Sequence, residues 1–408
     1  MVYSYIGGNM EENKKQKSFS TSETILLVLM ASLVSYFIGH ILVSNKDKSQ
    51  VVRHDPFISE FEKNYNYIID NYYESIDRQS LIDSAISGML ESLDDPYSSY
   101  IDEDTQDNFN ITLNGSYKGI GVQIIKDETN GYIFVSGVFK NSPASEAGLK
   151  PGDYIVSVNG KDVKTMEATE FSKYVREGTE KEFNMQILRG SEELTIKLVK
   201  EDVVISSVAS EVFEKNGKKI GYIYIGIFAS NTDEQFKNEL TELKSKNIDS
   251  LIIDVRDNSG GHLTAVDNML DLFVDRNHIK YQFEQNGVNT KIRGTNNNVE
   301  KYNIVLLGNE NSASASEILI SSLRDNLGAI LIGKKTYGKG TVQELINLSD
   351  GSQYKITVKK WLTPNGKWIN DTKGIVPDIE VELDKKYIET QDDNDDTQLQ
   401  AAIDYLTK

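Results

Sequence analysis

Apolar and polar residues follow different patterns in successive parts of the chain, beginning with one long apolar run. Residues 25–43 are apolar or glycine at all positions except Ser32, Ser35 and His40. As a helix that rises about 1.5 Å per residue, this run would span roughly 28 Å, close to the thickness of the apolar core of a membrane. The lysine-rich stretch 14–17 precedes it and favours a cytoplasmic N-terminus.

This pattern predicts a cytoplasmic segment over 1–23 and a single transmembrane anchor over 24–44, with the rest of the chain outside the cytoplasm. A cleaved signal peptide and a buried helix of a soluble protein are the alternatives. The run is longer than a typical signal-peptide core, and no clean small-x-small cleavage site follows it.

The next part, residues 45–112, reads as helical over most of its length. Two groups of apolar residues each have the spacing of one helix face. They are Phe57, Phe61, Tyr65, Ile68 and Ile69, and then Leu81, Ile82, Ile86, Met89 and Leu90. The turn Asp-Asp-Pro-Tyr-Ser-Ser-Tyr at 94–100 ends the helical part, and we interpret it as structural.

Residues 113–202 contain short apolar runs that are separated by glycine turns, which predicts a β-rich domain. Tyr132–Val138 reads as a strand, and Ser142–Leu149 reads as a short helix that ends at a glycine. Pro151–Gly160 reads as a turn, a strand and an Asn-Gly turn.

Residues 203–388 alternate strands with helices, which predicts an α/β core with a mixed sheet and flanking helices. Ser250–Val255 and Asn303–Leu307 are the runs typical of strands buried on both faces. In such a core, ligands bind beyond the carboxyl ends of the strands. The last part, 389–408, reads as a solvated acidic linker and an amphipathic helix that docks on the core or on a partner.

Composition narrows the possible chemistry. The net charge is −18, which makes nucleic acid an improbable partner. The chain has no cysteine, so thiol nucleophiles, disulfides and thiolate metal sites are excluded, and its four histidines leave few candidates for a histidine base.

A turn of small residues and a lysine between two glycines carry the candidate chemistry. Ser314 lies in the stretch Asn-Ser-Ala-Ser-Ala-Ser-Glu at 311–317, and Lys339 follows 25 residues later. A serine needs a neighbouring base to become a nucleophile, and a lysine can be that base when burial lowers its pKa.

Other interpretations of the same turn remain open. Ser314 and Glu317 match a helix capping box, which is compatible with a nucleophile because a helix N-terminus favours developing negative charge. Ser312 and Ser316 are rival nucleophiles in the same run.

Two further motifs suggest different chemistry. His262 follows a glycine pair and could belong to a Ser-His-Asp triad, although no second feature supports it. The stretch 328–335 partly matches a nucleotide-binding P-loop, but Lys335 replaces the required Ser or Thr and the middle of the stretch reads as a strand.

Taken together, the motifs resemble those of the C-terminal processing peptidases, also called tail-specific proteases. Ser314, Lys339 and Gln343 have the spacing of the Ser-Lys-Gln set of that family. The turn Asp-x-Arg-x-Asn-x-Gly-Gly at 254–261 and the Thr-Pro-x-Gly…Gly-Ile-x-Pro-Asp block at 363–378 match as well. The resemblance implies a serine nucleophile, a lysine base and a glutamine that orients the lysine.

The same resemblance implies two binding features. Backbone N–H groups of Gly260 and Ala315 would form the oxyanion hole. The motifs Ser-Pro-Ala-x-x-Ala-Gly-Leu and Pro-Gly-Asp-x-Ile-x-x-Val-Asn-Gly resemble a PDZ domain, which binds peptide C-termini at a sheet edge. The loop that would capture the carboxylate consists of Gly119, Ile120, Gly121 and Val122.

The expected protein is a membrane-anchored, extracytoplasmic serine endopeptidase. A PDZ domain at 113–202 would select substrates with unstructured C-termini, and a protease core at 203–388 would cleave them without a metal or another cofactor. Two helical parts, the N-terminal region and the C-terminal helix, could mediate homodimerisation. The alternative is a catalytically silent or signal-gated PDZ scaffold at the membrane.

Overall fold

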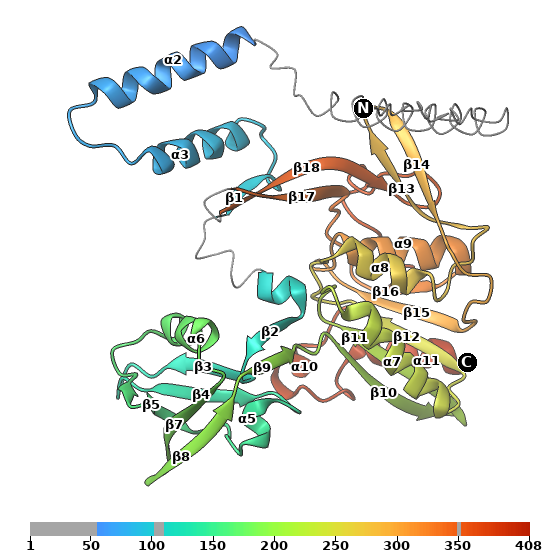
Figure 1. Ribbon diagram of the computed structural model, residues 1–408. Coiled ribbons are helices and arrows are strands. Elements are labelled where there is room, and N and C mark those ends of the chain that lie inside the picture. The colour runs from blue at the N-terminus through green and yellow to red at the C-terminus, as the bar shows by residue number, and fades with distance from the viewer. Residues whose placement is uncertain (1–54, 102–109, 349–351) are drawn as a thin grey trace, which may run out of the picture. The chain divides into compact units, whose positions relative to one another are not determined.

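The computed structural model describes residues 55–101, 110–348 and 352–408 (Figure 1). The chain divides into two compact units, residues 1–82 and 83–408. The described part of the first unit contains helix α2 (Pro56–Asn71) and the start of α3 (Arg78–Glu91). The helical prediction for this region is therefore confirmed.

Helix α2 begins at a local capping signal and exposes its apolar residues. The Asp55 side chain accepts a hydrogen bond from the Phe57 N–H at 3.0 Å, and Pro56 occupies the first turn, where its missing N–H costs nothing. None of the residues of α2 is buried within the described chain, and the side chains of Phe57 and Ile58 are 78% and 64% exposed.

The β-rich region forms one six-stranded sheet and one strand pair. Alternation in β7 (Glu182–Arg189) puts Phe183, Met185 and Ile187 in the core. The other strands are β3 (Val122–Lys126), β4 (Ile133–Val138), β5 (Tyr154–Val158), β6 (Lys161–Asp162) and β8 (Glu192–Val199) in the sheet, and β2 (Ser116–Gly119) and β9 (Glu201–Val204) in the pair. The helices are α5 (Pro143–Glu146) and α6 (Ala168–Glu177).

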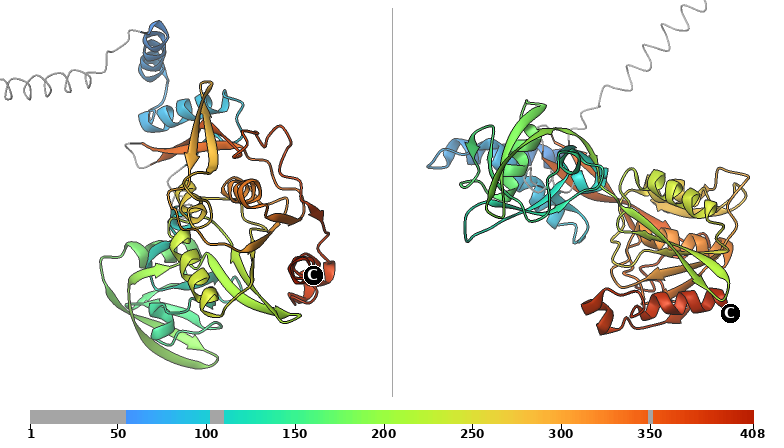
Figure 2. Two further views of the ribbon diagram at one scale, coloured as in Figure 1. Left: turned by 90° about the vertical axis from the view of Figure 1, so that its right-hand side faces the viewer. Right: turned by 90° about the horizontal axis from the view of Figure 1, so that it is seen from below.

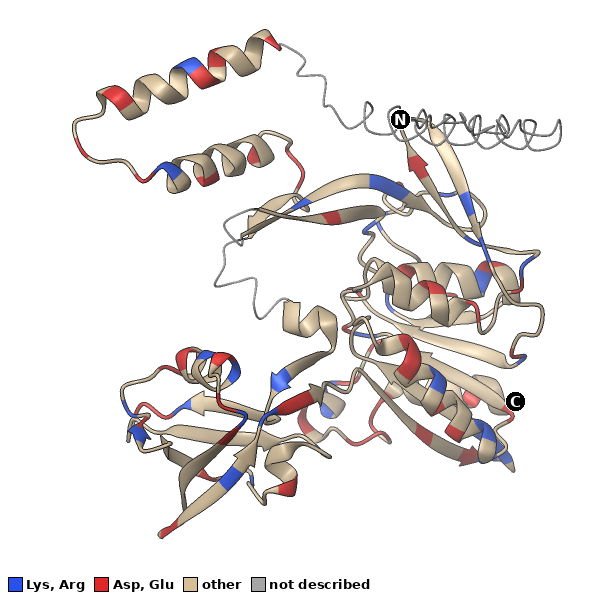
Figure 3. Cartoon of the chain, in the orientation of Figure 1, with Lys and Arg blue, Asp and Glu red and all other residues tan. Residues whose placement is uncertain are grey.

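A second six-stranded sheet forms the centre of the α/β core, in the order β10-β11-β12-β15-β16-β19. Its first pair is antiparallel and the others are parallel, so the predicted mixed sheet is confirmed. The strands are β10 (Val208–Lys215), β11 (Lys218–Ile225), β12 (Ser250–Asp254), β15 (Asn303–Gly308), β16 (Ile330–Gly333) and β19 (Ile379–Glu380). Charged residues are absent from β15 and β16, which Figure 3 shows as tan ribbons.

Helices cover both faces of this sheet, which explains why its central strands are apolar at nearly every position. On one face, Leu251 and Ile253 pack in a core shared with α7 (Thr232–Ser245), α8 (Leu263–Leu270) and α9 (Ala315–Leu327). On the other, Ile252 packs in a core shared with α11 (Thr397–Thr407), which follows the short α10 (Lys385–Thr390). Figures 1 and 2 show α11 along this second face. The predicted docking of the last helix on the core is confirmed.

A third sheet brings together segments from both ends of the chain. Strand β18 (Gln353–Leu362) pairs with β1 (Ser99–Ile101), β13 (Ile279–Gln285) and β17 (Thr341–Asn347), and β14 (Val288–Arg293) pairs with β13. The Asp-Pro-Tyr-Ser turn that precedes β1 is therefore held beside the strand that follows Lys339.

The fold-class prediction needs one correction. Among residues 55–101, 110–348 and 352–408, no helix is both long and apolar enough to cross a membrane. The single transmembrane helix predicted over 24–44 is contradicted, and with it the single-pass membrane localisation and the membrane contact. The segment itself lies outside the described residues. Its length satisfied the thickness criterion, but length alone does not decide membrane insertion.

Candidate active site

Ser314 occupies a strained turn between β15 and α9. Its backbone has φ +54° and ψ −112°, a region that residues with a side chain adopt at a cost of about 1–3 kcal/mol. Such strain is typical of functional sites, where the surrounding structure holds it. The residue is the N-cap of α9, so the N–H group of Ala315, the first residue of the helix, directly follows it.

The two rival serines have structural roles. Ser312 and Ser316 are fully buried, and their hydroxyl groups donate to the backbone carbonyls of Val255 and Asn258 at 2.7 and 2.8 Å. Ser314 remains partly exposed. Of the three serines in the turn, only Ser314 is therefore open to a substrate.

The glycine turn after β12 lies against Ser314. A Cβ atom on Gly260 would lie 2.9 Å from Ser314 Cβ and 3.2 Å from the Ala315 N atom, so only glycine fits there at its φ of +105°. The structure thus brings Gly260, Ser314 and Ala315 together. The Gly260 N–H donates to Asn258 Oδ1 at 2.9 Å, so a substrate oxyanion would have to share or replace that bond.

Asn258 is a residue of this turn whose role the sequence did not indicate. It is fully buried, its amide donates to the Ile225 carbonyl at 2.8 Å, and its own carbonyl accepts from the Ala313 N–H at 3.0 Å. Asn258 therefore joins the glycine turn to the Ser314 turn and to strand β11.

Lys339 lies in the loop between β16 and β17, with its ammonium group 5.0 Å from the ring centre of Tyr97. Burial lowers the pKa of Lys339, and the positive charge of Lys355 acts in the same direction, whereas Asp95 and Glu317 oppose the change. A lysine with a lowered pKa is the kind that can act as a base near neutral pH.

The turn at Asp95–Ser98, interpreted as structural from the sequence, lies beside this lysine. Ser98 Oγ donates to Asp95 at 2.6 Å and accepts from the Thr357 N–H at 3.0 Å, which anchors the turn to β18. Burial raises the pKa of Tyr97 to about 12, so its ring stays neutral against Lys339. The pairing of β1 with β18 places the turn in the site, and no signal in the turn itself indicated this.

Gln343 lies on β17 near the same lysine loop. Its amide nitrogen donates to the hydroxyl groups of Thr341 at 2.9 Å and Thr357 at 3.1 Å. Within the described residues, no hydrogen bond joins Gln343 to Lys339, so the orienting role remains a prediction.

Glu317 is a further residue whose place in the site the sequence did not fully indicate. The capping-box pattern predicted its contact with Ser314, and the Ser314 N–H does donate to Glu317 Oε2 at 2.9 Å. The sequence did not indicate that the Lys339 N–H also donates to the same oxygen at 2.9 Å.

The alternative motifs find little support. The Nε2 atom of His262 is buried without a hydrogen-bond partner in the described part of the chain, whereas a triad requires bonds to a serine and to an acid. The stretch suggested as a P-loop contains β16, a buried strand of the central sheet, instead of a phosphate-binding loop.

A groove in the β-rich region is lined by the predicted carboxylate loop. A cavity of about 160 Å³ lies between Gly119, Ile120 and Val122 on one side and Phe171 and Val175 of α6 on the other. This is the arrangement in which a peptide strand could lie along β3.

Tyr117 also lines this groove. Its ring packs on Gly119, where an added Cβ would lie 2.3 Å from Tyr117 Cε2. Burial raises the pKa of the Tyr117 phenol, and the backbone N–H groups of Gly121 and Val122 act in the opposite direction.

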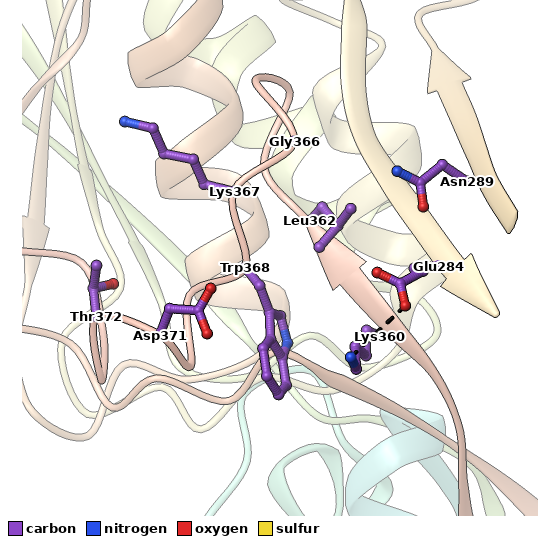
Figure 4. A pocket seen from close by; sticks show the side chains of 9 residues that line it. All are labelled: Glu284, Asn289, Lys360, Leu362, Gly366, Lys367, Trp368, Asp371 and Thr372. Carbon is purple, nitrogen blue, oxygen red and sulfur yellow. Dashed lines mark ion pairs between the residues drawn. The ribbon is translucent and has the colours of Figure 1, made fainter. Parts of the chain in front are cut away.

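A larger cavity of about 710 Å³ adjoins the lysine loop (Figure 4). The Trp368 indole lines it and donates to the Gly340 carbonyl at 2.9 Å, while Lys360 lies 4.5 Å from the Trp368 ring centre and 3.7 Å from Glu284. The cavity carries both charge signs, so it does not indicate one ligand.

Comparison with known proteins identifies the family. The carboxy-terminal processing protease CtpB of Bacillus subtilis (strain 168) is 36% identical over 330 residues, which cover 80% of this chain and 68% of that protein. The chain belongs to the carboxy-terminal processing proteases, peptidase family S41. CtpA of the same organism is 34% identical over 374 residues, covering 91% of this chain and 78% of the relative.

Family models match three parts of this S41 peptidase. They are Peptidase family S41 at 219–381, the PDZ domain at 134–189 and the Activating protease CtpB N-terminal domain at 39–105. Among solved structures, the photosystem II D1 C-terminal processing protease matches with a TM-score of 0.48 and 27% identity, covering 85% of this chain and 91% of that one. Membership of this family supports a serine-type peptidase.

Proposed function

We propose that this S41 peptidase cleaves peptide bonds with Ser314 as the nucleophile and Lys339 as the general base. The observation that carries the proposal is the strained, partly exposed Ser314 at the start of α9, packed against Gly260 and tied through Glu317 to the loop of the half-buried Lys339. This arrangement supports acyl transfer because it supplies a nucleophile, a base and backbone donors.

In the proposed reaction, Ser314 Oγ attacks the peptide carbonyl and its proton passes to neutral Lys339. The lysine then gives the proton to the leaving amine, and water hydrolyses the acyl-enzyme with the same lysine as base. The N–H groups of Ala315 and Gly260 would stabilise the oxyanion. Gln343 would orient the lysine. Because glutamine is neutral, it would not raise the pKa of Lys339 as a carboxylate would.

We further propose that the region 113–202 selects substrates by their C-terminal tails. The groove beside Gly119–Val122 offers backbone N–H groups to a carboxylate and an open edge along β3 to an extended peptide. A peptide with a free C-terminus should therefore bind more tightly than the same peptide with an amidated end, as measured by fluorescence anisotropy. Equal binding of both peptides would argue against carboxylate recognition.

Homodimerisation is a further part of the proposal. Helix α2 has no buried residue in the described chain, although one of its faces carries Phe57, Phe61 and Ile68. A second copy of the chain could cover this face. Sedimentation of the wild type and of Phe57→Ser would test this, since loss of a dimer in the variant is expected.

The decisive experiment compares the full chain with Ser314→Ala on a disordered protein that has an apolar C-terminus. Cleavage by the wild type alone is expected. Lys339→Ala should be inactive and His262→Ala active if the base is the lysine. If both the wild type and Ser314→Ala bind the tail but neither cleaves it, the scaffold or signal-gated alternative is favoured. Equal cleavage by both would contradict the assignment of Ser314.

A further inference from the structure

Glu317 is a buried carboxylate that accepts four hydrogen bonds from two separate segments. Its Oε2 accepts from the N–H groups of Ser314 and Lys339, each at 2.9 Å. Its Oε1 accepts from the Gly338 N–H at 2.7 Å and from the Thr336 hydroxyl at 2.6 Å. Glu317 is 0% exposed, so its carboxylate is removed from water.

An ionised carboxylate fits this set of partners. Its two oxygens together offer about four acceptor sites and no donor, and all four neighbours are donors. A glutamine would set its NH₂ group against at least one backbone N–H and leave buried donors unpaired. Burial raises the pKa of Glu317, but its four donors act in the opposite direction and favour the charged form.

Helix capping does not account for this geometry. In a capping box, the glutamate side chain accepts only one hydrogen bond, from the N-cap N–H, which here is the N–H of Ser314. The other three bonds come from residues 336–339, outside the helix. One atom, Glu317 Oε2, is shared by the N–H groups of the two residues that would form the catalytic dyad.

We propose that Glu317 is a positioning residue that holds the Ser314 turn and the Lys339 loop at a fixed separation through its ionised carboxylate. The proposal rests on the Ser-Lys mechanism proposed above. It assigns Glu317 no contact with the substrate: the residue acts through the backbone of Ser314 and Lys339 and through its charge.

The negative charge of Glu317 should affect the dependence of the rate on pH, which a purely structural residue would not. Lys339 is faced by the Tyr97 ring, by the carboxylates of Asp95 and Glu317, and by the ammonium of Lys355. Removing the negative charge of Glu317 removes one interaction that favours protonated Lys339, so the pKa of the lysine should fall further. The ascending limb of the rate against pH, which follows neutral Lys339, should then move to lower pH.

The test uses the full chain with Glu317→Gln, Glu317→Asp and Thr336→Val. We expect Glu317→Gln to lower kcat by about 100-fold with KM nearly unchanged, because a misplaced dyad loses rate and not binding. Its ascending limb should also move to lower pH. Glu317→Asp keeps the charge but shortens the reach, so kcat should fall while the limb stays in place. Thr336→Val removes one donor to Oε1 and should cost much less.

The results separate this proposal from the mechanism on which it rests. If wild type and Ser314→Ala cleave equally, the mechanism fails whatever Glu317 does. If Ser314→Ala is inactive but Glu317→Gln keeps the wild-type rate and pH limb, the positioning role is overturned. Should Glu317→Gln not fold, as judged by circular dichroism, Glu317→Asp decides: lower kcat with an unmoved limb supports the proposal, and wild-type kcat contradicts it.

Discussion

In the proposed mechanism, the glycine turn of the protease core and the glycine loop of the PDZ region would offer backbone N–H groups to an anion in similar ways. In the core, the Gly260 N–H would stabilise the oxyanion, and it already donates to Asn258 Oδ1. In the PDZ region, the N–H groups of Gly121 and Val122 would bind a carboxylate, and they already act on the phenol of Tyr117, whose pKa they lower. In both places the chain supplies its own oxygen to the donors.

The two oxygens differ in how firmly they are held. Asn258 is fully buried and bonded to two further backbone groups, so its position is part of the core. Tyr117 lines an open groove, and its ring packs on Gly119. We therefore expect a peptide carboxylate to displace the phenol more easily than an oxyanion would displace the Asn258 side chain, because a change at Asn258 requires movement of the turn itself. Rigid donors suit catalysis, and a replaceable oxygen suits reversible binding.

Ser314→Ala is expected to show the largest difference between the protease core, which cleaves, and the PDZ region, which binds peptides. The substitution removes the nucleophile and leaves the groove of the PDZ region unchanged, so cleavage should fall on the order of 10⁴-fold or more. Peptide affinity should stay within about twofold, since no contact of the groove is lost. Measurement of both quantities on one preparation tests this, and a parallel loss of binding would show that the two regions are not independent.

A second large effect is expected from Lys339→Arg. Arginine remains protonated at every accessible pH, so it cannot take the proton of Ser314, and cleavage should fall by about 10³-fold or more at all pH values. Lys355→Arg is the matched control, because it keeps a positive charge near the site. Substantial activity of Lys339→Arg would contradict the role of the lysine as the base.

The stability of the core can be reduced without any change in the PDZ region. Arg256 donates to Asp396 at 3.0 and 2.8 Å and to Asp254, and all three side chains are at least nine-tenths buried. Asp396→Asn breaks a buried ion pair, so the free energy of unfolding of the core should fall by about 3 kcal/mol in urea titrations. Asp404 lies on the exposed face of α11, the helix that begins directly after Asp396. Asp404→Asn is the control and should have little effect on the free energy of unfolding.

The sequence predicted the features that depend on neighbouring residues. The apolar runs at 250–255 and 303–307 identified the buried strands, and the turns of small residues and glycines identified Ser314 and Gly260. Contacts between distant residues were missed. The acidic stretch interpreted as a solvated linker ends in Asp396, a buried partner of Arg256 that lies 140 residues away in sequence.

Two contacts of the Lys339 loop were missed for a similar physical reason. The contacts of Tyr97 and Glu317 with the Lys339 loop depend on the pairing of β1 with β18 and on the packing of α9, which no local motif encodes. The apolar run over 24–44 shows the opposite failure, because a strong local pattern was taken to decide membrane insertion, and no helix of the described residues can span a membrane.

The smallest effect sharpens the comparison between the two glycine loops. Tyr117→Phe keeps the ring on Gly119 but removes the oxygen on which the N–H groups of Gly121 and Val122 act. A peptide carboxylate would then meet unoccupied donors, so binding of a C-terminal peptide should tighten by about 3–10-fold, the worth of one hydrogen bond. An amidated peptide should not gain. Isothermal titration calorimetry with Tyr132→Phe as the control would measure this. Weaker binding would mean that the phenol instead donates to the bound carboxylate, and that Tyr117 is a fixed part of the site as Asn258 is in the core.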